Sequence, residues 1–228
     1  MKLVSKNTLL AAMLAAASVS AFAADSVDLK IVGNIVPPSC TPTLTGGGII
    51  DYGNIPASTI AATGFTRLPQ HGVTVTITCD SPAMVALRTI DNRAGTAVVG
   101  MANTLSSAAN DTNAFGLGAV SGKQIGAYVL NQYFHPSVNG GSDNAYTMKS
   151  DDNGATWAST YSDGPGGFQR PDGSRLNSWY SGTVTPMAVT VANQYYTVDA
   201  AINSKANLPS LKQAVPLDGL ATFSIVYL

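Results

Sequence analysis

Two cysteines, Cys40 and Cys79, and two histidines, His71 and His135, carry the most reactive side-chain chemistry of this 228-residue chain. An even number of cysteines in an exported chain favours a disulfide, because thiols oxidise outside the cytoplasm. A catalytic thiol and a zinc site are alternatives, although neither histidine is spaced as a Cys-His partner and no two metal ligands stand close together. We therefore predict a Cys40–Cys79 bridge, no metal ion, no cofactor and no catalytic residue.

The expectation of export comes from the first 23 residues, which have the parts of a secretory signal peptide. Lys2 and Lys6 are positive, residues 9–19 are apolar, and small residues stand at Ala21 and Ala23. The apolar run is shorter than the about 20 residues that a membrane-spanning helix needs. We expect residues 1–23 to be removed and residues 24–228 to form one exported domain without a transmembrane span.

All thirteen acidic residues of this chain are aspartates, and the sequence has no Glu. An EF-hand calcium loop is excluded, because that loop ends in a bidentate Glu. Asp91 and the pair Asp151–Asp152 are carboxylates with which an enzyme could move protons, but the sequence assigns no distance between them. Catalysis by paired aspartates stays an alternative, and we predict that the chain is not an enzyme.

A second pattern includes one of these aspartates. Ser150, Asp152, Gly154 and Trp157 match S-x-D-x-G-x-x-W, the Asp-box. In sialidases and other proteins that carry it, the motif is a hairpin turn in which the Asp bonds backbone groups and Gly supplies a positive φ. A single copy predicts a structural turn and not a glycosidase.

Composition indicates which elements position these residues. Only 11% of the residues are charged and the formal net charge is -1. A nucleic-acid-binding protein is therefore excluded, because it would need a basic surface. Amphipathic helices are disfavoured, because few charged residues are available for their polar faces. Alternating patterns predict strands, listed here by residue number: 27–35, 49–52, 73–79, 85–90, 125–130, 183–191, 195–202 and 221–228. Residues 92–124 are expected to be loops with at most short strands, and residues 131–182 an inserted polar, aromatic region with extra hairpins. This pattern favours an all-β antiparallel sandwich.

The clearest strand of the sequence is 73–79. Val73, Val75, Ile77 and Cys79 fall on one face, and Thr74, Thr76 and Thr78 on the other. Cys79 is therefore expected on the buried side, where a disulfide to Cys40 would join two neighbouring strands.

Four stretches together resemble the pilin subunits of chaperone-usher fimbriae. They are 30–40 (KIVGNIVPPSC), 50–60 (IDYGNIPASTI), 73–80 (VTVTITCD) and 221–228 (ATFSIVYL). The resemblance covers roughly 27–80 and 217–228 and identifies a divergent, larger member. It implies an immunoglobulin-like sandwich without its last strand, whose groove is filled first by a periplasmic chaperone and then, after assembly at an usher, by the N-terminal strand of a neighbouring subunit.

The resemblance also implies roles for particular side chains. Val27, Leu29 and Ile31 would be the donor-strand residues, and Phe223, Ile225 and Tyr227 would line the edge that the chaperone and donor strand contact. The implied function is that of a fimbrial structural subunit, located in the periplasm and then at the cell surface, with a role in adhesion. In the alternative, 27–35 is the first strand of a self-contained sandwich.

Aromatic residues of the 131–182 region suggest another function. Trp157 and Trp179 are candidate contacts to a host glycan, because exposed aromatic rings stack on sugars. A soluble periplasmic or tip-located glycan-binding protein that does not polymerise is therefore the alternative function. The same tryptophans could instead fill a small core beneath the insertion.

Overall fold

The computed structural model describes residues 27–141, 145–161 and 167–228. The predicted signal peptide at 1–23 lies outside these ranges. The chain divides into a segment that ends at Val36 and a domain from Pro37 to Leu228, which are described separately. Among the described residues, no helix is long and apolar enough to cross a membrane.

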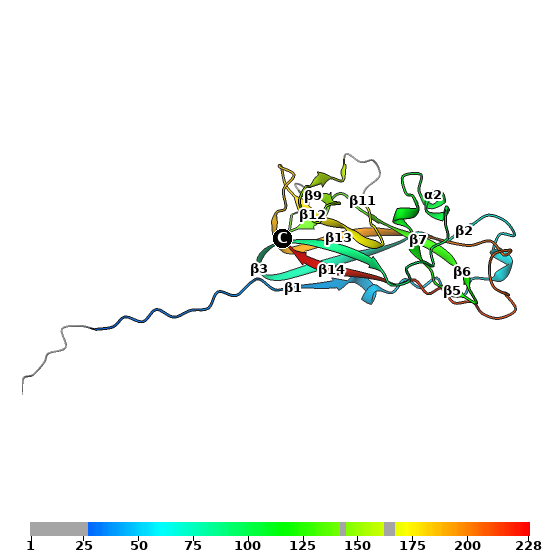
Figure 1. Ribbon diagram of the computed structural model, residues 1–228, viewed down its shortest axis with the longest axis horizontal. Helices are drawn as coiled ribbons and strands as arrows, with labels where there is room; N and C mark the ends of the chain where they lie inside the picture. The colour runs from blue at the N-terminus through cyan, green and yellow to red at the C-terminus, as the bar shows by residue number, and fades with distance from the viewer. Residues whose placement is uncertain (1–26, 142–144, 162–166) are drawn as a thin grey trace, which may run out of the picture. The chain divides into compact units, whose positions relative to one another are not determined.

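Antiparallel strands make up almost all of the regular secondary structure of the domain (Figure 1). The longer strands are β1 (Cys40–Leu44), β3 (His71–Asp91), β7 (Gly126–Gln132), β9 (Tyr146–Ser150), β12 (Asp172–Tyr180), β13 (Ala188–Ile202) and β14 (Ala221–Tyr227). The two-residue strands are β2 (Thr66–Arg67), β4 (Phe115–Gly116), β5 (Ala119–Val120), β6 (Lys123–Gln124), β8 (Ser137–Val138), β10 (Ala158–Ser159) and β11 (Gly167–Phe168). Short helical turns are η1 (Thr45–Gly48), η2 (Ala57–Thr59), α2 (Met101–Leu105) and η3 (Asp111–Asn113).

The long strand β3 belongs to two layers. Its first half pairs with β1 on one edge and β13 on the other, and β13 continues to β7. Its second half pairs with β14 on one edge and β12 on the other, and β12 continues to β9. The two layers pack face to face around a core in which Trp179, Tyr196 and Ile77 are among the largest fully buried side chains. These pairings confirm the predicted all-β antiparallel sandwich.

The alternation in 73–79 sets the inward face as predicted. Val73, Val75, Ile77 and Cys79 are buried and contribute to the main core, whereas Thr78 is exposed. The predicted strand at 85–90 is confirmed as the second half of β3, and the strand predicted at 125–130 as β7. The insertion contains hairpin pairing between β9 and β10, also as predicted.

Three strand predictions are wrong. Residues 27–35 form no strand, and Val27, Leu29 and Ile31 are 95%, 87% and 89% exposed, so neither face of this alternating segment is buried. Residues 49–52 form no strand either, although Ile50 and Tyr52 pack against the core. The predicted strands at 183–191 and 195–202 are largely one strand, β13, because its polar middle pairs continuously with β3. Side-chain alternation describes faces, whereas a strand also needs a partner for its backbone groups.

Candidate functional site: an open groove between β1 and β14

The edge strands β1 and β14 approach each other at one end. The backbone N–H of Cys40 donates a 2.8 Å hydrogen bond to the hydroxyl of Tyr227, so the start of β1 lies beside the end of β14. Among the described residues, each strand pairs with β3 alone. The outer edge of each strand therefore has no β-partner, and an edge of this kind can accept an added strand.

A groove of about 190 Å³ lies between the turn that follows β1 and the first residues of β14. Its walls include Leu44, Ile50 and Tyr52 on one side and Leu217, Ala221 and Phe223 on the other. Its floor is apolar and comes from β3, β7, β13 and the loop before β5: Val73, Leu117, Tyr128, Leu130, Val198 and Ala200. The floor residues belong to the main core, so the groove opens directly onto the interior of the sandwich.

The predicted edge residues line this opening in part. Phe223 and Ile225 pack against the main core but stay half-buried, and Phe223 contacts the buried ring of Tyr196 at 5.2 Å between centroids. Tyr227 is 50% exposed and anchors the start of β1 through its hydroxyl. Apolar side chains of β14 are thus half-buried along an edge that has no β-partner among the described residues.

The groove continues beyond its first cavity. A second hollow of about 650 Å³ shares Ile50, Tyr52 and Leu217 with the first and extends between the loop 50–60 and the loop 208–217. Its apolar base is a separate small core of Ile60, Ile125, Ile202 and Leu208. The two hollows therefore adjoin each other. The first is lined mostly by apolar side chains, and the second adds polar ones such as Asp51, Asn54 and Lys212.

An ion pair fixes the entry to β14. Arg93 donates two hydrogen bonds, of 2.8 and 2.7 Å, to the carboxylate of Asp218. This contact holds the pKa of Asp218 below its usual value. Asp91, one of the candidate catalytic carboxylates, is buried and accepts the backbone N–H groups of Arg93 and Gly116 at 2.8 Å each. Asp91 is therefore a structural acceptor that holds the turn next to the groove.

The predicted disulfide is present between Cys40 and Cys79, which face each other directly in the pairing of β1 with β3. Both sulfurs are in the bridge, so the alternative of a catalytic thiol is wrong. His71 packs edge-on against Tyr52, and His135 packs at a tilt against Phe134. Within the described ranges, no group of three His, Cys, Asp or Glu side chains is placed to hold a metal ion.

The Asp-box forms the turn between β9 and β10. Ser150 donates to Asp152 at 2.7 Å and accepts the backbone N–H of Gly154 at 2.8 Å, while Asp152 accepts the backbone N–H of Thr156 at 2.9 Å. Gly154 has φ +92°, which glycine adopts without strain. A Cβ added there would lie only 3.8 Å from the Trp157 ring, so this tryptophan packs against the turn, as the motif predicts.

The neighbouring Asp151 forms ion pairs beside the Asp-box turn. It pairs with Arg175 through two hydrogen bonds, of 2.7 and 2.8 Å, and it lies 3.5 Å from Arg170. The hydrogen bonds from Arg175 lower the pKa of Asp151. Asp151 and Asp152 thus have separate structural partners, and the geometry gives no support to a paired-carboxylate catalytic site.

The candidate glycan contact at Trp179 is wrong. Its side chain is 0% exposed, and its indole N–H donates a 3.0 Å hydrogen bond to the buried side chain of Gln194. Trp179 thus belongs to the main core between the two layers, and a surface ligand has no access to it. Trp157 is half-buried against the Asp-box turn.

Comparison with known proteins identifies relatives that share the whole chain. Protein GltF of Escherichia coli K12 is 34% identical over 98% of both chains. The chain belongs to the same family as GltF. The uncharacterized protein YhcF of the same strain is 28% identical over 92% of this chain and 94% of YhcF. A family described as "Protein of unknown function (DUF1120)" matches residues 29–129, which include β1, β3 and much of the groove floor. None of these names states a function.

Sequence reasoning missed most of the groove. Leu117, Tyr128, Leu130 and Val198 appear as ordinary strand or loop residues. The pairing of β7 with β13, and of β4 with β7 for Leu117, brings them under the gap beside β14. One wall of the groove did have a pattern in the sequence: in the stretch 50–60, apolar Ile50 and Tyr52 alternate with Asp51. That alternation reflects packing onto the core without a strand.

The Asp-box makes a specific prediction about pH. Hydrogen bonds from the Thr156 hydroxyl, the Thr156 backbone and Ser150 lower the pKa of Asp152 to about 2. Because the folded-state pKa lies below the unfolded value of about 3.9, the ionised turn stabilises the fold above that value and loses this contribution as the pH falls toward 2. NMR titration of the Asp152 carboxyl carbon is expected to give a midpoint near 2, and Thr156→Val is expected to raise it. Thr185→Val, an exposed change in the loop before β13, is the matched control; an unchanged midpoint in Thr156→Val would contradict the assignment.

Proposed function

We propose that this chain is a fimbrial-type structural subunit that assembles by donor-strand addition. Its groove accepts an extended strand from another molecule, and its own segment 27–36 supplies such a strand to the next subunit. The observation that carries the proposal is the groove between β1 and β14, which opens onto the core beside two edges that have no β-partner in the part of the chain that the structure describes. An immunoglobulin-like sandwich without its last strand would have this opening.

The segment 27–36 has the properties of a donor. It is extended, and its apolar side chains Val27, Leu29 and Ile31 alternate with Asp28 and Lys30. Insertion of the apolar face into a neighbour's groove would contribute about 1.5–3 kcal/mol for each side chain before the cost of ordering the segment. Backbone hydrogen bonds to a free edge would fix the direction and the register of the inserted strand.

A bare groove of this kind is an aggregation hazard, so the proposal includes transient protection. A periplasmic chaperone would occupy the groove after export, and an usher would exchange it for the donor segment of a neighbouring subunit. The protein would accordingly be located first in the periplasm and then in a surface fibre, where it also serves adhesion.

The test uses the mature full-length chain. Wild-type protein is expected to form multimers of increasing mass in size-exclusion chromatography with light scattering. Leu29→Asp together with Ile31→Asp is expected to abolish them, because charged side chains cannot enter an apolar groove. Both residues are exposed in the subunit, so the far-UV circular dichroism spectrum of the variant should match that of the wild type and show that the subunit still folds.

The matched control changes the alternate positions of the same segment, Asp28→Ser together with Lys30→Ser, and should still assemble. A wild-type chain that is a stable monomer at all concentrations without a chaperone would overturn the proposal. Multimers that survive the Leu29 and Ile31 substitutions would show that another surface joins the subunits.

A further inference from the structure

A second surface of the domain gathers aromatic rings from four separate parts of the chain. We call it the aromatic surface and define it by these residues: Tyr133, Phe134 and His135 after β7, Tyr146 on β9, Tyr161 after β10, and Tyr195 on β13. Contacts between rings join all six. The centroids of Phe134 and His135 are 4.3 Å apart, and the longest link, between Tyr133 and Tyr195, is 6.4 Å.

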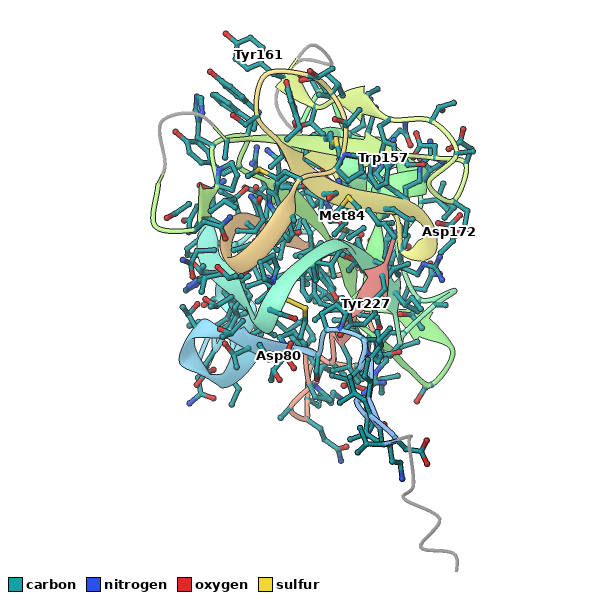
Figure 2. All side chains as sticks on the ribbon, turned by 90° about the vertical axis from the view of Figure 1, so that its left-hand side faces the viewer. Asp80, Met84, Trp157, Tyr161, Asp172 and Tyr227 are labelled. Atoms are coloured by element: carbon teal, nitrogen blue, oxygen red, sulfur yellow. A yellow bond between two sulfur atoms is a disulfide. The ribbon has the colours of Figure 1, made fainter. Side chains whose placement is uncertain are left out.

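Four of these six rings are open to solvent: His135 and three tyrosines. Tyr133, Tyr161 and Tyr195 are 48%, 62% and 43% exposed, which is unusual for three large rings in one network. The side chain of Tyr161 projects outward from the top of the domain in Figure 2, well away from the labelled Trp157 and Tyr227. None of the six residues lines the groove, so the aromatic surface is a separate feature of the molecule.

The fold holds the rings in place. The backbone N–H of Tyr133 donates to the carbonyl of Tyr195 at 2.9 Å, and the side chain of Gln194 donates to the carbonyl of Tyr133 at 2.6 Å. Gly72 makes room for the Tyr195 ring, since a Cβ at that position would collide with it.

Beneath the surface, Tyr146 packs on Tyr180. That ring is buried, and its hydroxyl is hydrogen-bonded to Ser159 at 2.8 Å. Rings that are fixed in this way before binding lose little side-chain entropy when a ligand stacks on them.

The chemistry of the aromatic surface favours a sugar over an apolar protein segment. Three of its four exposed rings, Tyr133, Tyr161 and Tyr195, carry hydroxyl groups, and the fourth is the imidazole of His135. A ring face attracts C–H groups, while the phenol hydroxyls and the His135 imidazole offer hydrogen bonds at the rim. The six rings themselves offer hydroxyl and imidazole groups and no carboxylate, ammonium or guanidinium group, so the contacts that they can make suit a neutral ligand. A neutral pyranose has the matching two-sided character, with one face of C–H groups and a rim of hydroxyls.

We propose that the aromatic surface binds neutral pyranose sugars by stacking on Tyr133, Tyr161 and Tyr195. The site differs from the one that the tryptophans suggested, because Trp179 is in the core and Trp157 supports the Asp-box turn. The inference does not depend on donor-strand assembly, since a monomer and a fibre subunit would present the same rings.

The experiment applies the full mature chain to an array of neutral oligosaccharides that end in hexoses or N-acetylhexosamines. Wild-type protein is expected to bind a subset of these. Tyr161→Ala and Tyr133→Ala are each expected to weaken binding about tenfold, whereas Tyr161→Phe, which keeps the ring face, should stay within about threefold. Trp157→Ala is the control and should bind as the wild type does. Leu29→Asp with Ile31→Asp should also bind normally, which separates this site from the assembly proposal.

A second measurement covers the case in which an alanine variant does not fold. The tyrosine rings of the wild-type protein are labelled with ¹³C and followed by NMR. The ring resonances of Tyr133, Tyr161 and Tyr195 are expected to shift when the tightest-binding oligosaccharide of the array is added. The proposal is overturned if no array member binds, if binding survives both alanine substitutions, or if the shifts appear elsewhere. A change in oligomer mass in Tyr161→Ala without any sugar binding would assign the surface to protein contacts and also overturn it.

Discussion

Replacement of both Cys40 and Cys79 by alanine is expected to lower the free energy of unfolding by about 4 kcal/mol. The bridge closes a loop with a sequence separation of 39, and removal of that closure returns conformational entropy to the unfolded chain. The folded state also loses its covalent link between β1 and β3. Because β1 and the turn after it form one wall of the groove, the same variant should lose donor-strand assembly.

Urea unfolding followed by far-UV circular dichroism measures this effect. The matched control is Thr41→Ala with Thr78→Ala, the next register pair, whose side chains are exposed. That control should change stability by less than about 1 kcal/mol. A loss of under about 1 kcal/mol in the cysteine variant would mean that β1 is held by its hydrogen bonds and packing alone.

The substitution Trp179→Ala is expected to lower the free energy of unfolding by about 3–5 kcal/mol. The indole is fully buried, and its N–H satisfies Gln194, whose own amide donates to the carbonyls of Tyr133 and Tyr195 at 2.6 and 3.0 Å. The substitution would therefore leave a cavity in the core and a buried amide oxygen without its donor. It should also loosen the backbone beneath the aromatic surface.

The same far-UV unfolding measurement compares Trp179→Ala with Trp157→Ala. The second tryptophan is half-buried, so its loss is expected to be clearly smaller. Trp179→Phe restores much of the volume but not the N–H donor, and it should cost about 1–3 kcal/mol. Equal losses at positions 157 and 179 would contradict the assignment of Trp179 to the main core.

Local chemistry made several features predictable from the sequence. The alternation of Val73, Val75 and Ile77 with threonines sets one inward face for any strand that forms there, and the structure has that face buried. The Asp-box turn depends on contacts within eight residues, so its pattern was sufficient. The disulfide followed from two cysteines and an expected oxidising setting.

The tertiary structure decided what depends on partners far apart in the chain. Alternation in 27–35 shows that a strand is possible there, but a strand exists only where another backbone accepts its hydrogen bonds, and these residues stay extended and exposed. Likewise, the core position of Trp179 follows from the packing of two layers.

The groove and the aromatic surface depend on long-range pairing in the same way. The groove exists because β1 and β14 pair with the two halves of β3 and leave their outer edges open. The aromatic surface brings Tyr195 next to Tyr133 through the pairing of β13 with the chain that follows β7. The sequence by itself determined which faces are apolar and which turns form, because those depend on neighbouring residues. The tertiary structure alone decided which faces stay uncovered, because that depends on strand order.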